Sequence, residues 1–330
     1  MKVLAIHEDK RSYGEGGGAE TMLRDVTRAL ELRGHEVRWY QGDGDFAEVM
    51  ATFRPDVCQV QTVHNFLGFG PVRWLQRHSV PHVWALMDYW PFCGGRMLLT
   101  NQDQESCPAV AGVCDGSCAA GKAPALYKEI VNRSPVLALN DYTADIYRRN
   151  GLRCDYVVEL GTDTTFFTPD PAKRTAGKIV TTCAWPQYRT KGMPVLHEAL
   201  QRIGATATLI TGKPRETVRD LLQTGSIFVF PSTYEETYGL CLTEALSTGL
   251  ACIASTVSGA RAQLQDGETG RLFPNRDAGA LADILRELLA DDAECQRLGA
   301  NARAHMEQEH SLEAMGARFE RVYQEVMKHG

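Results

Sequence analysis

A short apolar run, a polar turn and a helical stretch fill residues 227–249, and this segment constrains the fold most. The run from Ile227 to Phe230 is short and rich in β-branched and aromatic residues, which is typical of a buried strand. The stretch after it ends at Gly249, as many helices do. A strand that turns into a helix is the repeating unit of α/β folds. The same order recurs in both halves of the chain, so we predict an α/β fold.

The turn of this segment carries residues suited to a ligand. Glu236 lies in the turn, Gly239 precedes the helical stretch, and Glu244 lies within it. The start of a helix offers backbone N–H groups and a positive dipole end to a phosphate, whereas carboxylates accept hydrogen bonds from hydroxyls. This combination indicates a nucleotide-sugar site. The alternative is that both glutamates are solvated residues of a helix start, where acidic side chains are common.

Length and charge restrict the class of protein. The 330 residues are enough for two domains of about 150 residues each. The net charge of −6 argues against a general nucleic-acid binder. No apolar run reaches the roughly 18 residues that span a bilayer, and the first residues become charged too early for a signal peptide. We therefore expect a cytoplasmic protein without a transmembrane segment, which leaves peripheral membrane contact open.

A glycine-rich segment follows the first predicted strand, Val3 to His7, and precedes an amphipathic helix. Glycine lets the backbone approach a ligand closely. Gly14, Gly16 and Ala19 fit the weaker form of the dinucleotide fingerprint, and Asp43 after the next strand could bind a ribose. The fingerprint should follow its strand at once, however, and six residues intervene here. A flexible turn that requires glycine is the alternative.

Two polar residues follow predicted strands of the first half. His64 comes after the strand that starts at Val57, and Asp88 after the strand that starts at Val80. The carboxyl ends of parallel strands face the ligand crevice in α/β folds. His64 and Asp88 are therefore candidate residues of the acceptor side, although a lone histidine is more often structural.

Four cysteines lie close together in a polar segment, residues 88–122, that has little to pack. They are Cys93, Cys107, Cys114 and Cys118, at spacings of 14, 7 and 4. Four thiolates could hold a structural Zn²⁺ or an iron–sulfur cluster, but the spacings differ from the paired C-x-x-C of strong zinc motifs. Unconnected thiols, or a lid over an acceptor site, are the alternatives.

A turn-rich link, residues 161–171, separates the two halves, so we place a domain boundary there. A new strand follows from Ile179 to Cys183, and after it a turn with Arg189, Lys191 and Gly192 leads into a helix. Basic residues between a strand and a helix are placed to neutralise phosphate. The alternative is that these basic residues are solvated surface residues, which would give the same sequence pattern. Two Rossmann-like domains facing each other would bind a ligand in the cleft between them.

Several segments together resemble glycosyltransferase family 4, the retaining enzymes of GT-B architecture, over nearly the whole chain. The strongest is PSTYEETYGLCLTEAL, in which Glu236 and Glu244 are spaced as E-x7-E. GGGAETMLRDVTRALELRGHEV is similar to the family's opening loop and helix, LGTDTTFFTP to its interdomain link and SGARAQLQDGETGRLF to a later stretch. Lys191 and Gly192 resemble its phosphate-binding turn.

The resemblance implies a donor domain, residues 161–310, an acceptor domain, residues 1–160, and a last helix, residues 311–330, that packs back on the acceptor domain. Lys191, helped by Arg189, would bind the donor diphosphate, and Glu236 would hold the sugar hydroxyls. No cofactor is implied for catalysis. The other donor-binding residues that it implies are Gly16, Gly17, Gly18, Tyr238, Gly239, Leu240 and Glu244.

Three departures from the family pattern leave alternatives open. Met87 stands where the family usually has histidine, and Ala184, Trp185 and Pro186 stand where it has an arginine. Only thirteen residues, 213–225, lie where the family usually fits a further strand. We therefore predict a retaining transferase that uses a nucleotide sugar, in glycan, polysaccharide or glycoconjugate synthesis. The acceptor is an unidentified sugar, lipid-linked glycan or small molecule. The alternatives are a catalytically weak nucleotide-sugar binder and a nicotinamide-dependent oxidoreductase.

Overall fold

The structure is a computed structural model of the chain, and it describes residues 1–8, 18–98, 107–110, 112–116, 118, 121–183 and 188–329. The chain forms two compact units. The N-terminal unit comprises Met1–Arg96, Pro108–Leu160 and Leu312–Gly330, and the C-terminal unit comprises Met97–Cys107 and Gly161–Ser311.

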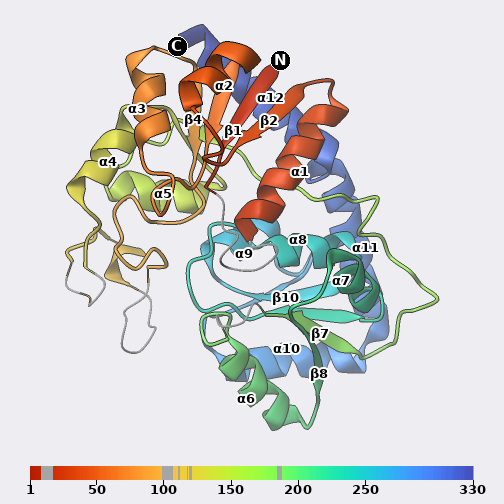
Figure 1. Cartoon of the computed structure of the whole chain (residues 1–330). Helices are drawn as coiled ribbons and strands as arrows, with labels where there is room; N and C mark the ends of the chain where they lie inside the picture. Colours follow the sequence, from red (N-terminus) through yellow and green to blue (C-terminus); the bar gives the residue numbers. More distant parts are fainter. Residues whose placement is uncertain are drawn as a thin grey trace. The chain divides into compact units, whose positions relative to one another are not determined.

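The N-terminal unit is built on a parallel sheet. Among the described residues this sheet has six strands in the order β2-β1-β3-β4-β5-β6. Figure 1 labels β1, β2 and β4 of this sheet. The strands are β1 Lys2–Ile6, β2 Glu36–Tyr40, β3 Val57–Val60, β4 His82–Ala85, β5 Val136–Ala138 and β6 Tyr156–Val157. The helices are α1 Gly18–Leu32, α2 Phe46–Phe53, α3 Gly70–Arg77, α4 Ala125–Asn132, α5 Asp141–Arg149 and α12 Leu312–His329, with a 3-10 turn at Pro108–Val110.

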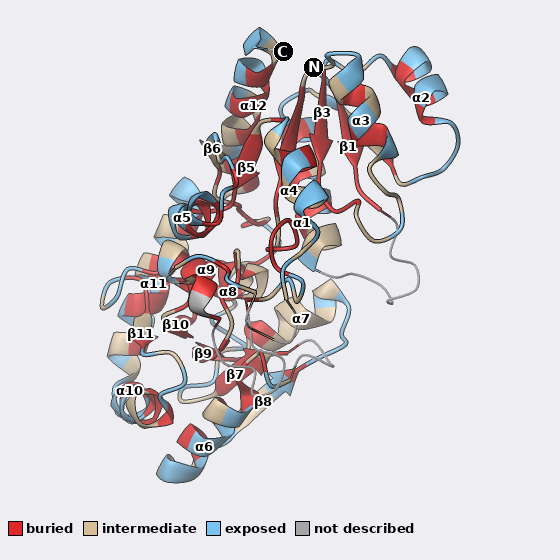
Figure 2. Ribbon diagram, turned by 90° about the vertical axis from the view of Figure 1, so that its left-hand side faces the viewer, coloured by how far each residue is buried: buried red, intermediate tan, exposed pale blue. Residues whose placement is uncertain are grey.

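Helix α12 completes the N-terminal unit although it follows the whole C-terminal unit in sequence. It packs against α1 and β4, and Figure 2 shows buried residues alternating with exposed ones along it. The contact is close at Gly316, where a Cβ atom would lie 2.7 Å from the carbonyl oxygen of Ala29. Arg33 of the loop after α1 donates to Glu320, with 2.6 Å between Nη2 and Oε2. The apolar stripe of this helix therefore serves packing within the unit.

The C-terminal unit is a second α/β layer structure. Its described residues form a parallel sheet of five strands in the order β11-β10-β9-β7-β8. The strands are β7 Ile179–Thr182, β8 Ala207–Ile210, β9 Ile227–Phe230, β10 Ala251–Ser255 and β11 Arg271–Phe273. The helices are α6 Met193–Ile203, α7 Arg215–Leu222, α8 Leu240–Ser247, α9 Ser258–Gln263, α10 Ala278–Ala290 and α11 Asp292–Glu309.

Two parallel sheets flanked by helices confirm the predicted α/β fold class. The strand β9, which the sequence marks by its apolar residues, is buried along its whole length and lies between β10 and β7. The short segment between β8 and β9 holds α7 and no strand. Within the described part of the chain, no helix is both long enough and apolar enough to cross a membrane.

Candidate functional site

Backbone and hydroxyl hydrogen bonds hold two loops of the C-terminal unit together at the carboxyl ends of β7 and β9. The carbonyl oxygen of Thr190 accepts from the backbone N–H of Thr233 at 2.9 Å and from its hydroxyl at 3.2 Å. The hydroxyl of Ser232 donates to the same carbonyl at 3.3 Å. Gly192 closes the first loop in the left-handed region, with φ at 72°. The loops that carry Lys191 and Glu236 are therefore fixed against each other.

Lys191 and Glu236, which the sequence predicts as catalytic residues, contact each other. The Nζ atom of Lys191 lies 2.8 Å from Oε1 of Glu236, and their side chains are 16% and 8% exposed. Nζ also lies 3.4 Å from the hydroxyl of Tyr234 and 5.2 Å from the centre of its ring. Tyr234 is a contact that the sequence did not predict. This arrangement places a cation, a carboxylate and a phenol together in a nearly buried position.

The electrostatics of this cluster follow from burial and from the ion pair. Burial is the largest single effect on the pKa of Lys191 and lowers it, but the attraction and hydrogen bond of Glu236, together with Tyr234 and Cys241, outweigh burial, so the pKa is raised overall and the ammonium form is favoured. Burial, and then the negative charge of Glu236, raise the pKa of Tyr234. Burial raises the pKa of Cys241 to about 12, against the lowering effect of Lys191. The cluster therefore presents one cation beside neutral phenol and thiol groups.

The loop that contains Glu236 is also fixed by helix α9. Gly259 donates its N–H to the carbonyl oxygen of Glu236 at 2.8 Å. A Cβ atom at Gly259 would lie 2.6 Å from the carbonyl oxygen of Tyr238, so only glycine allows this approach. The neighbouring Glu235 accepts from the backbone N–H of Ser258 at 2.8 Å and from its hydroxyl. The sequence did not predict a role for Glu235, because this contact joins residues that lie far apart in the chain.

The other predicted donor-binding residues surround the start of α8. Gly239 is the residue before this helix, and among the described residues no side chain caps it. Tyr238 is buried, and its hydroxyl lies 3.2 Å from Nδ1 of His310. In the helix itself, Oε1 of Glu244 lies 3.8 Å from Nε of Arg215, whose guanidinium also faces the ring of Phe167 at 5.1 Å. The N-terminal turn of α8 thus begins at Leu240, with a carboxylate one turn further on.

Arg189 and the glycine loop are placed differently. Arg189 is exposed, and its carbonyl oxygen accepts the N–H of Gly192 at 2.9 Å. Gly16 and Gly17, together with Gly14 of the dinucleotide fingerprint, lie outside the described residues. Gly18 is the first residue of α1. The roles expected for these residues remain predictions.

In the N-terminal unit, the carboxyl end of β1 carries two fully buried polar residues, His7 and Glu8. Oε2 of Glu8 accepts the backbone N–H of Asn65 at 2.9 Å and that of Phe66 at 2.8 Å. Oε1 accepts from the side-chain amide of Asn65. Buried carboxylates are costly unless hydrogen bonds compensate them, and here the bonds fix the loop after β3. The sequence did not predict this role for Glu8, since the partners lie 57 residues and more away.

His64 and Asp88 both contact Trp90. The ring of His64 stacks on the indole with 4.3 Å between centroids and 17° between planes. Oδ1 of Asp88 accepts the backbone N–H of Trp90 at 2.9 Å, and its carbonyl oxygen accepts the hydroxyl of Tyr147 at 3.1 Å. Both candidate residues therefore lie at the carboxyl edge of the sheet, where their positions after β3 and β4 place them.

The predicted cysteine metal site gains no support from the structure. Cys93, Cys107 and Cys114 are buried, Cys118 is half-buried, and all four are free thiols. Among the described residues no group of three or more histidine, cysteine, aspartate or glutamate side chains is arranged to hold a metal ion. Much of the segment that carries the cysteines lies outside the described residues.

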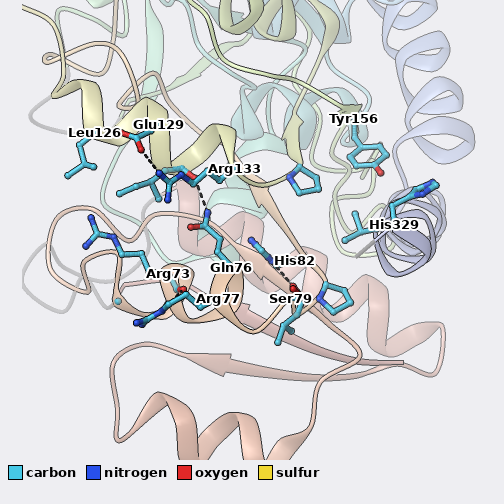
Figure 3. A pocket seen from close by; sticks show the side chains of 16 residues that line it. Arg73, Gln76, Arg77, Ser79, His82, Leu126, Glu129, Arg133, Tyr156 and His329 are labelled. Atoms are coloured by element: carbon cyan, nitrogen blue, oxygen red, sulfur yellow. Dashed lines mark hydrogen bonds and ion pairs between the residues drawn. The ribbon is translucent and has the colours of Figure 1, made fainter.

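A separate hollow of about 890 Å³ in the N-terminal unit lies away from these candidates (Figure 3). It is lined by residues that precede β4 and β5, among them Pro81 and Pro135, and therefore lies at the amino edge of the sheet. Arg73, Arg77 and Arg133 extend around it, and Arg133 pairs with Glu129 of α4. None of the residues predicted to bind donor or acceptor lines this hollow.

Comparisons of the sequence with known proteins identify relatives. The family model described as "Glycosyl transferases group 1" matches residues 196–305. A D-inositol 3-phosphate glycosyltransferase of Xylanimonas cellulosilytica is 24% identical over 92% of this chain and 91% of its own length. A phosphatidyl-myo-inositol mannosyltransferase of Mycobacterium leprae is 32% identical, over 33% of this chain and 29% of its own.

Solved structures share the fold. Sucrose-phosphate synthase from Thermosynechococcus elongatus has a TM-score of 0.77 at 17% identity, covering 100% of both chains. The structure of HepE from Anabaena in complex with UDP and glucose has a TM-score of 0.71 at 16% identity, covering 98% of this chain and 99% of its own. Fold and sequence together define a glycosyltransferase with the GT-B fold. The family match over residues 196–305 and the glycosyltransferases among the relatives confirm the predicted resemblance at this level.

Proposed function

We propose that the protein is a cytoplasmic, retaining glycosyltransferase of family 4 that transfers a sugar from a nucleotide-sugar donor. The observation that carries this proposal is the 2.8 Å contact between Lys191 and Glu236 at the carboxyl ends of two parallel strands. A cation for phosphate and a carboxylate for sugar hydroxyls meet there. The complexes of HepE with UDP and with UDP-glucose support a donor of this class.

In the proposed reaction, an oxygen of the acceptor hydroxyl forms a bond to the anomeric carbon, and the bond from that carbon to the diphosphate breaks. The hydroxyl proton ends on the released nucleoside diphosphate, on the same face of the sugar. Lys191, with Arg189, neutralises the charge that develops on the diphosphate, which lowers the barrier. Glu236 accepts hydrogen bonds from the donor sugar. This charge neutralisation needs no divalent metal.

The remaining residues hold the donor. The glycine loop that ends at Gly18 lies close to the diphosphate, and the backbone N–H groups of residues 238–240 at the start of α8 bind sugar and phosphate. Glu244 binds the ribose hydroxyls, and its contact with Arg215 orients it. The start of α8 combines the positive end of a helix dipole with the backbone N–H groups of a first turn, so it supplies an anion-binding part of the site.

Release of nucleoside diphosphate from a panel of nucleotide sugars tests the proposal. Lys191→Ala and Glu236→Ala should each lower the turnover by about a hundredfold or more, the scale for removing one preorganised charge stabiliser. Lys173→Ala is the matched control, because Lys173 is an exposed lysine of the same unit that pairs with Asp170. A chelator should leave the rate unchanged. Undiminished turnover in both variants of the pair would refute the assignment.

A second candidate function is nucleotide-sugar binding without efficient turnover. Two features favour it: Met87 in place of the family's histidine, and the single helix α7 between β8 and β9, where the family has a further strand. Calorimetry separates the two functions. Saturable binding of a nucleotide, with neither hydrolysis nor transfer from any donor in the panel, would establish the second.

A further inference from the structure

A hollow of about 460 Å³ in the N-terminal unit combines an aromatic wall with two cations. It lies at the carboxyl edge of the sheet, because its lining residues follow β3 and β4 and precede α4. The lining residues that matter for its chemistry are His64, Phe66, Trp90, Arg96, Lys122 and Tyr127. It is distinct from the hollow at the amino edge.

Phe66 presents its ring to solvent at this hollow, with 61% of the residue exposed. A mobile loop does not explain the exposure, because the backbone N–H of Phe66 donates to the fully buried carboxylate of Glu8 at 2.8 Å. A second bond to Glu8 from the N–H of Asn65 fixes the preceding residue at 2.9 Å. An exposed aromatic ring on a loop held by a buried carboxylate is a surface built for contact with a ligand.

The rest of the aromatic wall is rigid. His64 stacks on Trp90 at 4.3 Å, and Tyr127 meets the same indole edge-on at 5.6 Å and 67°. Phe69 packs against both of these rings, with centroids 5.2 Å from Tyr127 and 5.9 Å from Trp90. These rings offer flat apolar faces in a preformed cavity, which suits the C–H face of a sugar or cyclic polyol.

Arg96 and Lys122 supply positive charge beside these rings. The segments that carry them are paired, since Cys93 forms a bridge with Lys122 and Gly94 donates to Gly121 at 3.0 Å. Both side chains are exposed, and neither forms an ion pair with a carboxylate of the described residues. Two cations that are free to bind an anion at the rim of an aromatic cavity indicate a ligand with a negative group.

We propose that this hollow binds the acceptor, and that the acceptor is a monosaccharide-sized sugar or polyol bearing a phosphate or carboxylate. The identification of this ligand as the acceptor rests on the proposed function, but the binding itself can be measured without the donor. The aromatic wall buries the apolar face of the ring, while Arg96 and Lys122 bind the anionic substituent. The position at the carboxyl edge is where ligands of parallel sheets bind.

Calorimetric titration of the full chain tests this proposal with four probes: glucose 6-phosphate, glucuronate, glucose and inorganic phosphate. We expect at least one of the two charged sugars to bind about tenfold or more tightly than both glucose and phosphate, since one charge-assisted hydrogen bond is worth about that factor. The double variant Arg96→Met/Lys122→Met should remove this preference. Phe66→Ala should weaken the binding of both charged sugars and leave phosphate binding unchanged.

Arg73→Met and Leu126→Ala are the matched controls, because they remove an exposed cation and an exposed apolar side chain from the other hollow. Equal binding of glucose and the charged sugars, or retention of the preference in the double variant, would overturn the proposal. Phosphate binding as tight as that of the sugars, or no binding of either charged sugar at millimolar concentration, would also overturn it.

Donor turnover separates this inference from the proposed function. The variants at Phe66, Arg96 and Lys122 should retain nucleotide binding, whereas transfer to the charged acceptor falls with the binding of that acceptor. If the wild-type protein binds no nucleotide but binds the charged sugar through these residues, the transferase assignment fails and the site stands.

Discussion

The backbone of Gly192 approaches Pro231 so closely that a Cβ atom at residue 192 would lie 1.7 Å from the carbonyl oxygen of Pro231. The φ angle of 72° adds a second reason for glycine, since other residues are strained in this region. The contact joins the turn before α6 to the loop after β9, and thereby sets the distance between Lys191 and Glu236.

Gly192→Ala should therefore destabilise the protein by at least about 3 kcal/mol, because backbone cannot yield as a flexible side chain does. Urea unfolding measures the loss. Gly204→Ala is the matched control: its φ angle is 65°, but nothing lies within 4 Å of the added Cβ atom. That variant should lose only about 1 kcal/mol for the left-handed conformation. Equal losses in the two variants would show that the contact with Pro231 is not tight.

The ion pair of Lys191 and Glu236 should show strong energetic coupling in a double-mutant cycle. Lys191→Met and Glu236→Gln each leave one buried partner uncompensated. Each should therefore lower the free energy of unfolding by more than the corresponding change in an exposed ion pair of this protein does. The double variant should be more stable than the sum of the two losses by about 1–3 kcal/mol. Additive losses would contradict the contact.

Arg286 and Asp283 provide the comparison for that cycle. They pair at 2.6 Å, but their side chains are 60% and 70% exposed. Water screens such a pair, and its coupling should be below about 1 kcal/mol. Unfolding free energies of the six variants are the measurement.

His82 should make stability depend on pH. It is buried, its Nδ1 lies 2.6 Å from the carbonyl oxygen of Val80, and its Nε2 lies 2.7 Å from the hydroxyl of Ser134. Burial lowers its pKa, against a smaller raising effect of the bond to Val80, so the unfolded chain binds a proton more readily than the folded one. The contribution of His82 is therefore full above the unfolded pKa of about 6.5 and is lost as the pH falls below it.

Unfolding free energies between pH 8 and pH 5 test this expectation, and the range brackets the ordinary histidine pKa of about 6.5. His82→Gln should flatten the decline on the acid side. His78→Gln removes an exposed histidine of the same unit and should leave the slope as it is in the wild-type protein. An unchanged slope in the His82 variant would contradict a lowered pKa.

Much of the fold could be predicted because its strands are short apolar runs between turns. The run from Ile227 to Phe230 is a central strand, and the helices before Gly34 and after Gly192 have clear periodicity. Helix α11 was not predicted, since its buried face is built largely from small residues such as Gly299 and Ala302. A stripe of small residues can be recognised as a packing face only when the neighbouring element is known.

The candidate site could be predicted in part. Residue types and spacing singled out Lys191 and Glu236, and the structure brings them into contact. Tertiary contacts were not visible in the sequence: Glu8 binds the loop of Phe66 across more than fifty residues, and the stacking of His64 on Trp90 joins two different strand ends. Local patterns hold no information on which strand end meets which.

The return of α12 to the N-terminal unit has a consequence for folding on the ribosome. Synthesis runs from β1 through the whole C-terminal unit before Leu312 emerges, yet α1 and β4 pack against the helix that begins there. Domains usually fold in the order in which they are made. In this protein the C-terminal unit can complete its sheet first, while the N-terminal unit must wait with an uncovered apolar face around Ala29. Nascent chains stalled before residue 312 should therefore be the ones that chaperones bind.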